Sequence, residues 1–349
     1  MRLRRSDPSK PGIRRVRRGK GFSYVAADGG TIDKETRQRI LDLAIPPAWQ
    51  DVWICSYPNG HIQAVGTDDA GRRQYLYHPD WHEAQSQDKH ERVRRLARRL
   101  PKVREATRRD LAKKGRPRER VLAAALRMLD AGLFRSGGDR YERDNGSHGV
   151  ATLRREHVTI RGSTVEFCFP AKSGIEREAM IEDAGLATAI RSFKRNGPPS
   201  GRLLAYRTPA GWHDVTAADI NAYFKELAGD EFTVKDLRTW GATVLAAVLL
   251  ADMPGVDVDL EEASDKERAK AQREAVRLVA EHLGNTPAVA RASYVDPELI
   301  DKHQDGVALA SAWKRELTLA DRRRLERGEL ANARKRDALE RAVLRLLTR

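Results

Sequence analysis

The feature that most constrains the fold of this 349-residue chain is a change in its hydrophobic pattern near residue 84. Before that point, short segments alternate apolar and polar residues and are separated by Pro-Asn-Gly and Asp-Ala-Gly turns; they span residues 52–57, 61–65 and 74–78. After it, apolar residues recur every three or four positions, beginning at Val93. A chain of this length is expected to form more than one domain. The pattern therefore predicts an α+β protein with a small β-rich N-terminal domain and a larger, mainly α-helical domain.

Five segments follow from this pattern and from the local charge. We expect a disordered basic arm at 1–20, a β-rich domain at 21–80, a linker at 81–90, a helical domain at 91–312 and a charged C-terminal helix at 313–349. The arm has nine Lys and Arg against one Asp, so it is expected to be solvated when free and to lie along phosphates when nucleic acid is present. Strand-like residues around Gly162 predict a small three-stranded antiparallel sheet within the helical domain.

The net charge of +15 favours a polyanionic partner. Nucleic acid is the first candidate and an anionic membrane surface is the second. The longest apolar run, 242–251, is about half the length of a membrane-spanning helix, so we interpret it as a buried core helix. A soluble Arg-rich protein without such a partner remains the plain alternative.

No cofactor or metal site is expected from the sequence. Cys55 and Cys168 form no CxxC pair, the histidines form no HExxH motif, and no GxxxxGK[ST] or GxGxxG loop occurs. Asp252, Asp257 and Asp259 do not fit an EF-hand loop, so we interpret them as part of a solvated acidic loop. The cysteine usage fits a reducing cytoplasm, and the basic N-terminus lacks the apolar segment of a secretory signal.

Residues that can bind or attack a phosphate follow one another along the helical domain: Arg135, Lys172, Lys235, Arg238, Asn285 and Tyr294. The guanidinium of arginine matches pairs of phosphate oxygens, lysine can act as a proton donor, and a tyrosine hydroxyl can attack phosphorus. Each residue alone has a plainer interpretation. A single tyrosine is usually a packing residue, a turn lysine is usually solvated, and an arginine at a helix end often serves only the helix dipole.

Taken in order, these residues resemble the catalytic pattern of the type IB DNA topoisomerases, and in particular of the small poxvirus-like branch that is also found in bacteria. The stretch Gly66–Tyr77 is similar to part of the family's β-rich N-terminal domain. The resemblance covers roughly residues 20–312. It implies an enzyme that relaxes supercoiled duplex DNA by cutting and resealing one strand, without ATP, metal or cofactor.

The resemblance also implies a role for each candidate. Tyr294 would be the nucleophile that becomes linked to a 3′ phosphate, while Arg135 and Arg238 would hold that phosphate. Lys172 would protonate the leaving 5′ oxygen, and Lys235 would assist near the phosphate.

The implied DNA contacts outside the catalytic pattern are Arg72, Arg73, Gln74, Tyr75 and Tyr141. Glutamine can bond a base edge through its amide, and tyrosine can pack on a base or sugar. The plainer interpretation of the first four is a sheet with one polar face.

One position departs from the poxvirus-like pattern, which usually carries His where this chain has Asn285. An amide can donate to a non-bridging oxygen but cannot titrate, so the resemblance implies charge stabilisation there rather than acid–base chemistry.

The implied partner is double-stranded DNA, held by a monomeric clamp in the cytoplasm at the nucleoid. Two alternatives stay open: a tyrosine recombinase, although its His-x-x-Arg is Lys235-x-x-Arg238 here, and a basic DNA-binding protein without activity.

Overall fold

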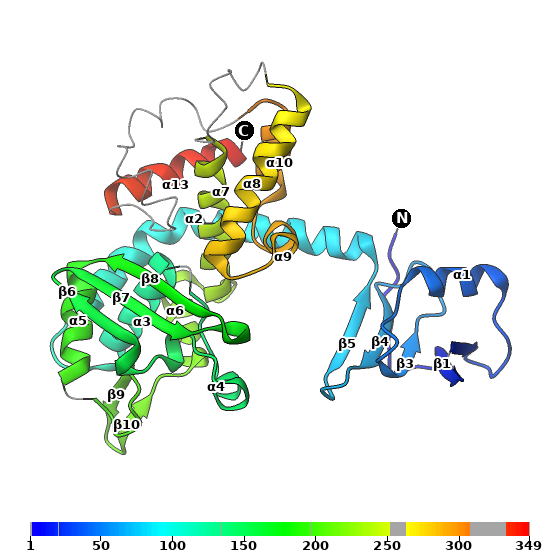
Figure 1. The fold of residues 1–349 in the computed structure, drawn as a ribbon, viewed down its shortest axis with the longest axis horizontal. Helices are drawn as coiled ribbons and strands as arrows, with labels where there is room; N and C mark the ends of the chain where they lie inside the picture. Colours follow the sequence, from blue (N-terminus) through cyan, green and yellow to red (C-terminus); the bar gives the residue numbers. More distant parts are fainter. Residues whose placement is uncertain are drawn as a thin grey trace. The chain divides into compact units, whose positions relative to one another are not determined.

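The structure is a computed structural model, and it describes residues 2–19, 21–132, 134–195, 197–251, 263–307 and 333–348. The chain divides into two compact units, residues 1–89 and 90–349 (Figure 1). The acidic loop that contains Asp252, Asp257 and Asp259 lies outside the described residues.

The first unit is a five-stranded antiparallel sheet with one helix. The strand order is β2-β1-β3-β4-β5, and the elements are β1 (Ile13–Arg18), β2 (Gly21–Val25), α1 (Lys34–Asp42), β3 (Gln50–Ile54), β4 (Ile62–Thr67) and β5 (Arg73–Tyr77). Asp33 caps α1 by accepting a hydrogen bond from the Thr36 backbone N–H at 2.7 Å. Ile40 of α1 is buried in one apolar cluster with Ile13 and Ile54 of the sheet. The predicted β-rich N-terminal domain is therefore present.

The prediction of a disordered arm at 1–20 is wrong for the described part of that segment. Its Ile-Arg-Arg-Val-Arg-Arg sequence forms β1, which pairs with both β2 and β3. The strand forms because Ile13 supplies a buried apolar side chain, while Arg15 donates hydrogen bonds to the carbonyls of Ile45, Pro46 and Trp49. A high charge does not prevent strand formation when alternate side chains point into solvent.

The prediction of a linker at 81–90 is also wrong, because those residues are helical and do not interrupt the secondary structure. They lie in α2 (Pro79–Leu111), and the boundary between the two units falls inside this helix.

The second unit is mainly helical and carries the predicted three-stranded antiparallel sheet, so the α+β prediction is confirmed (Figure 1). The strands of this sheet are β6 (Val158–Arg161), β7 (Thr164–Pro170) and β8 (Glu176–Glu182), and a second, two-stranded sheet joins β9 (Ala205–Thr208) to β10 (Gly211–Asp214). The helices are α3 (Arg118–Gly132), α4 (Asp139–Asn145), α5 (Ala184–Arg195), α6 (Ala217–Ala228), α7 (Val234–Ala251), α8 (Asp265–Leu283), α9 (Pro287–Ser293), α10 (Pro297–Gln304) and α13 (Ala333–Leu347). Short 3-10 turns span Val150–Thr152, Arg155–His157 and Lys172–Gly174.

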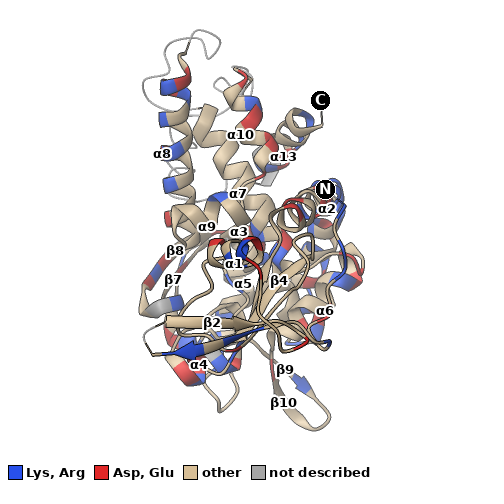
Figure 2. Ribbon diagram, turned by 90° about the vertical axis from the view of Figure 1, so that its right-hand side faces the viewer, with Lys and Arg blue, Asp and Glu red and all other residues tan. Residues whose placement is uncertain are grey.

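Helix α7 is the centre of this unit. Every residue from Asp236 to Leu250 is buried, which confirms the core helix predicted from the apolar run at 242–251. Helix α3 is buried along most of its length and packs against α5, α6 and α7. By contrast, α8 is amphipathic, and Lys and Arg lie along its outer side (Figure 2).

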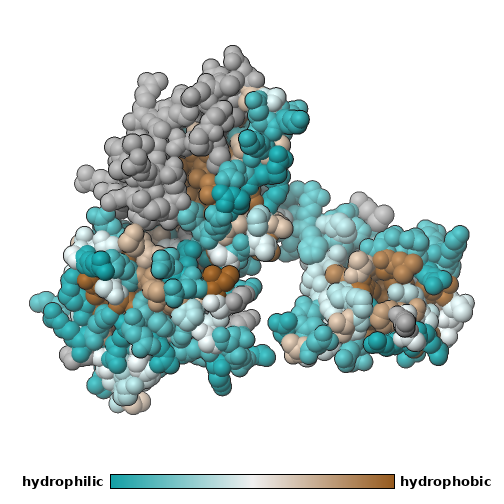
Figure 3. Space-filling view, viewed as in Figure 1, coloured by the Kyte–Doolittle hydropathy of each residue, from teal (hydrophilic) through white to brown (hydrophobic). Residues whose placement is uncertain are grey.

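Much of the surface seen in Figure 3 is hydrophilic. Among the described residues, no helix is both long enough and apolar enough to cross a bilayer.

Helix α13 is the described part of the expected C-terminal helix, since residues 313–332 lie outside the described residues. It is tied to the unit by a buried ion cluster. Arg104 of α2 donates to Asp130 of α3 at 2.9 Å and to Glu340 of α13 at 2.7 Å, and Arg336 donates to the same two carboxylates. Burial alone would raise the pKa of Asp130, but the charges of Arg104 and Arg336 outweigh it and hold that pKa well below its usual range.

We predict that Asp130→Asn lowers the free energy of unfolding of this unit by about 3–5 kcal/mol, because it leaves two buried guanidiniums with too little compensating charge. A carboxyl whose folded-state pKa is depressed stabilises the fold above its unfolded pKa of about 4, and that contribution is lost as the pH falls. The free energy of unfolding of the variant should therefore fall less than that of the parent as the pH is lowered from about 5 to about 3.

Denaturant unfolding at several pH values measures both effects. The control is Asp144→Asn, which removes an exposed ion pair to Arg140 and should cost under about 1 kcal/mol. Equal losses in the two variants would contradict a stabilising role for the cluster.

Candidate active site

The C-terminal end of α8 is where two of the predicted arginines meet. The helix ends at Gly284, whose φ of 58° and ψ of 49° lie in the left-handed region that favours glycine. The carbonyl of Leu283 accepts a hydrogen bond from Arg238, and the next carbonyl, that of Gly284, accepts one from Arg135 at 3.0 Å. Two guanidiniums from distant parts of the sequence are thus held by adjacent backbone oxygens.

Asn285 follows directly and joins this group. Its Oδ1 accepts a hydrogen bond from Arg135, and its backbone N–H donates to Ala280 at 2.9 Å. Its Nδ2 is buried and has no hydrogen-bond partner among the described residues. Buried polar groups are nearly always satisfied, so this donor is suited to an oxygen that a ligand supplies.

Tyr294 lies beside Arg238. Helix α9 begins with Thr286 as its cap and Pro287 in its first turn, and Tyr294 is the residue at which it ends. The centre of the phenol ring is 5.4 Å from the guanidinium carbon of Arg238. The side chain is half-buried against the core of the unit, which limits the positions that its hydroxyl can adopt.

The electrostatics of the site favour an anion. Burial, followed by the like charge of Arg135, lowers the pKa of Arg238 to about 10, although a hydrogen bond to Tyr294 raises it in part. Burial also lowers the pKa of Arg135. Both guanidiniums nevertheless stay charged at neutral pH. Within the described residues Arg135 is bonded only to neutral oxygens, so a phosphate would supply the missing negative charge.

Arg177 is a third arginine of this site, and the sequence interpretation missed it. It lies on β8 opposite Phe169, whose ring is 5.8 Å from that of Phe134, the residue before Arg135. Burial, and then the charge of Arg135, lowers its pKa. It has no hydrogen bond or ion pair within the described part of the chain. The available signal was the alternation Glu176-Arg177-Glu178, which places the arginine on the opposite face of the strand from the two acids.

The segment that carries Arg135 is fixed by a close crossing of two glycines. Gly137 has a φ of 81°, and a Cβ on Gly149 would lie 2.4 Å from the Gly137 nitrogen and 2.7 Å from the Arg135 oxygen. The Val150 N–H also donates to the Arg135 carbonyl at 3.0 Å. No larger residue fits at Gly149 without moving the backbone of the arginine.

The structure brings together Arg135, Arg238, Asn285 and Tyr294, but it does not bring the two candidate lysines into contact with them. Lys172 is exposed at the turn between β7 and β8, the hairpin position that the sequence predicted. Lys235 is exposed at the start of α7, three residues before Arg238. Neither side chain has a hydrogen bond or ion pair to a described residue.

The remaining candidates lie elsewhere. In the first unit, Asp68 accepts hydrogen bonds from Arg72 at 2.9 Å and from Gln74 at 2.8 Å, which lowers the pKa of Asp68 to about 2. Tyr75 is exposed, stacks on Tyr77 with a centroid distance of 6.0 Å, and has Arg73 5.9 Å from its ring centre. Tyr141 belongs to α4 in the second unit, but its side chain lies outside the described residues.

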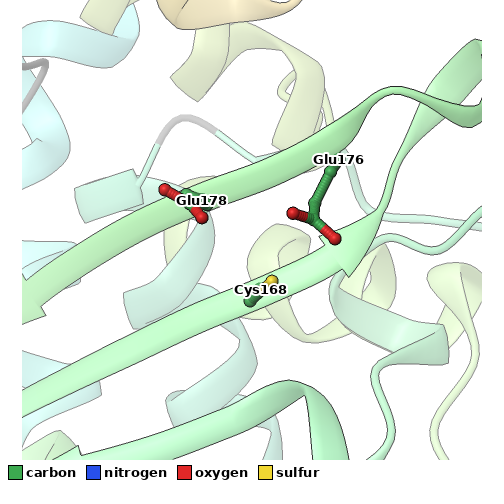
Figure 4. A group of neighbouring side chains, drawn as sticks. All are labelled: Cys168, Glu176 and Glu178. Carbon is green, nitrogen blue, oxygen red and sulfur yellow. The ribbon is translucent and has the colours of Figure 1, made fainter.

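Among the residues that the structure describes, one group of possible metal ligands lies on the outer face of β7 and β8: Cys168, Glu176 and Glu178 (Figure 4). All three residues are exposed. Partial desolvation and the two glutamates raise the pKa of the Cys168 thiol, which disfavours the thiolate that binds metals. We assign no ion to this group.

The sequence is similar to known proteins over most of its length. The family model described as eukaryotic DNA topoisomerase I, catalytic core, matches residues 78–318, and the model described as bacterial DNA topoisomerase IB, N-terminal domain, matches residues 21–68. The DNA topoisomerase 1B of Acanthamoeba polyphaga mimivirus is 30% identical over 303 residues, which cover 84% of this chain and 88% of that protein. The DNA topoisomerase 1 of Schizosaccharomyces pombe is 29% identical over 168 residues, which cover 48% of this chain and 20% of that protein.

Fold and matches together place the chain among the DNA topoisomerases, which are enzymes of the isomerase class. More narrowly, the two family models account for both units, and the mimivirus relative is similar over most of its length. The chain belongs to the type IB DNA topoisomerase family.

We predict that Gly149→Ala lowers the free energy of unfolding by about 3 kcal/mol, because the added Cβ meets backbone atoms that cannot rotate away. Gly162→Ala is the matched control: its φ of 59° is strained for alanine but its Cβ would enter open space, so the cost should be about 1 kcal/mol. Denaturant unfolding of both variants tests this. A smaller loss for Gly149→Ala than for Gly162→Ala would show that the crossing of the two glycines does not fix the segment.

Proposed function

We propose that this chain relaxes supercoiled duplex DNA by cutting one strand through Tyr294, letting the free end rotate and resealing the strand. The observation that carries the proposal is the convergence of Arg135, Arg238 and Asn285 around the half-buried Tyr294. Such a site supplies positive charge and a free amide donor next to a nucleophile. It is suited to a phosphodiester, whose single negative charge is shared by two non-bridging oxygens.

In the proposed reaction, the Tyr294 oxygen attacks phosphorus as the bond to the 5′ oxygen breaks. The product is a 3′-phosphotyrosyl link and a free 5′ hydroxyl, and the phenolic proton passes to water. Arg135 and Arg238 bind the non-bridging oxygens in the transition state. Resealing is the reverse attack by the 5′ hydroxyl, so neither ATP nor a metal or cofactor is needed to conserve the energy of the broken bond.

Asn285 stabilises charge in this proposal and transfers no proton. Its Oδ1 is occupied by Arg135, which directs Nδ2 away from that arginine and leaves it as a donor. One amide can therefore orient a catalytic guanidinium and bind a phosphate oxygen at the same time.

Lys172 is the proposed general acid, which protonates the leaving 5′ oxygen. Its exposed position at a hairpin turn lets the side chain reach into bound DNA, and it has no carboxylate partner among the described residues that would compete. Lys235 is proposed to assist close to the phosphate, because it precedes Arg238 by one turn of α7.

The proposed substrate contacts extend along the duplex. Lys266, Lys270 and Arg273 are exposed on α8, the helix that ends at the site, and can contact backbone phosphates (Figure 2). In the first unit, the polar and aromatic surface on β5 and the turn before it is proposed to contact bases and backbone, through Arg72, Arg73, Gln74 and Tyr75. Tyr141 is a further proposed contact. We propose a monomer that acts as a clamp on cytoplasmic nucleoid DNA.

We predict that the parent chain relaxes supercoiled plasmid in EDTA without ATP and that Tyr294→Phe does not, because the variant lacks only the attacking hydroxyl. Binding of a duplex at moderate salt should change less than about two-fold. The control is Tyr57→Phe, which removes an exposed hydroxyl in the first unit. Relaxation by Tyr294→Phe would exclude this residue as the nucleophile, and relaxation by neither chain would exclude the proposed activity.

We predict that Lys172→Ala slows strand cleavage by about 10²–10⁴-fold, the usual contribution of a general acid. A substrate with sulfur in place of the 5′ bridging oxygen has a leaving group that needs no proton, so it should be cleaved at close to the parental rate. Arg135→Ala is the contrasting variant and should stay slow on both substrates. Equal slowing of Lys172→Ala on the oxygen and sulfur substrates would contradict the acid role.

A further inference from the structure

A single hydroxyl holds the backbone that directly follows Tyr294, on both sides of Val295. The Thr243 Oγ1 of α7 donates a hydrogen bond to the carbonyl of Tyr294 at 3.2 Å and accepts one from the N–H of Asp296 at 3.1 Å. Thr243 is about 1% exposed, so water does not compete with these bonds. The short connection between α9 and α10 is thereby fixed to α7.

Asp296 extends this link to a third helix. Its carboxylate is buried and accepts two hydrogen bonds from Arg94 of α2, both at 2.9 Å. The same carboxylate caps α10 through the N–H of Glu298 at 3.1 Å, and His90 lies 3.9 Å away. The bidentate geometry is the directional one for an Arg–carboxylate pair, so it fixes the orientation of Asp296 as well as its position.

We infer that Thr243, Asp296 and Arg94 form a clamp that positions Tyr294 for attack. The inference rests on the proposed function of Tyr294 as nucleophile. None of the three clamp residues is proposed to touch DNA; they act through the tyrosine backbone, and they are positioning residues. Arg238 and Thr243 both lie on α7, five residues apart, so one rigid helix holds both the phosphate-binding guanidinium and the anchor of the nucleophile.

The position of Tyr294 affects the rate of the proposed reaction. In-line attack requires the reacting oxygen to be held close to phosphorus in one direction, and a misplacement of about 1 Å can slow a reaction about 10²-fold. Tyr294 is the residue at which a helix of seven residues ends. Its φ of −132° and ψ of −33° lie outside the range of a regular helix. The hydrogen bonds of the short helix therefore do not by themselves fix the direction of its side chain.

The test compares Thr243→Val, which keeps the shape of the side chain but removes the hydroxyl, with Thr243→Ser, which keeps the hydroxyl. The measurement is the single-turnover rate of covalent adduct formation at saturating duplex, together with the noncovalent dissociation constant and the melting temperature. We expect Thr243→Val to form the adduct about 10- to 100-fold more slowly with a dissociation constant within about two-fold of the parent. Thr243→Ser should retain most of the parental rate.

Arg94→Lys gives a second measurement if Thr243→Val does not fold, because it keeps the charge but loses the two parallel bonds to Asp296. Arg95→Lys is its matched control: Arg95 is the next residue of α2 and pairs with Glu231 at 2.9 Å in an exposed position. Adduct formation should slow in Arg94→Lys and not in Arg95→Lys.

Parental rates in both Thr243→Val and Arg94→Lys would overturn the clamp. A loss shared equally by Thr243→Ser and Thr243→Val would do the same, because keeping the hydroxyl would then preserve none of the rate. A parent chain that forms no adduct at all would overturn the proposed function and the clamp with it, so the two failures are distinguished by the parent chain alone.

Discussion

The interaction on which the site depends is the pair of hydrogen bonds from Arg135 and Arg238 to adjacent carbonyls at the end of α8. Two like charges this close repel each other, and burial adds to the cost of holding them there. The negative end of the helix dipole and the two carbonyl oxygens offset part of that cost. Gly284 makes the arrangement possible, because its left-handed conformation ends the helix where these oxygens are needed.

The rest of the second unit keeps these groups in place. Helix α7 is buried along nearly its whole length and carries Arg238, while the crossing of Gly137 and Gly149 fixes the segment of Arg135. The ion cluster of α13 holds Asp130, which is five residues before Arg135 in the sequence. A well-packed core thus supports a small group of positive charges, and in the proposed function a phosphate is the negative partner that this preorganised group binds.

The sequence predicted the architecture well where the signal was local. The alternating strands, the apolar run that became α7 and the hairpin turn at Lys172 were all predictable from periodicity and turn residues. Strand β1 was missed because its sequence, Ile-Arg-Arg-Val-Arg-Arg, is highly charged and does not alternate apolar and polar residues. Pairing with β2 and β3 decides the structure of such a segment. Local pattern also gave no reason to place a boundary between units inside a continuous helix.

The candidate residues were found because their order resembled a known family, not because any one of them was distinctive. Contacts between distant segments were beyond that approach: Arg177 reaches the site through a sheet, and Thr243, Asp296 and Arg94 meet from three helices. No spacing rule links those positions. Their relationship follows from tertiary packing, which a single sequence does not reveal.

The most direct test of the central claim is to identify the amino acid that becomes attached to DNA. The parent chain would be incubated with a nicked duplex in which the short piece on the 3′ side of the cut, which carries the new 5′ hydroxyl, diffuses away after cleavage, and the covalent complex would be digested and analysed by mass spectrometry. We expect a 3′-phosphate on the peptide that contains Tyr294 and on no other peptide. Attachment to a different residue, or through a 5′ phosphate, would contradict it.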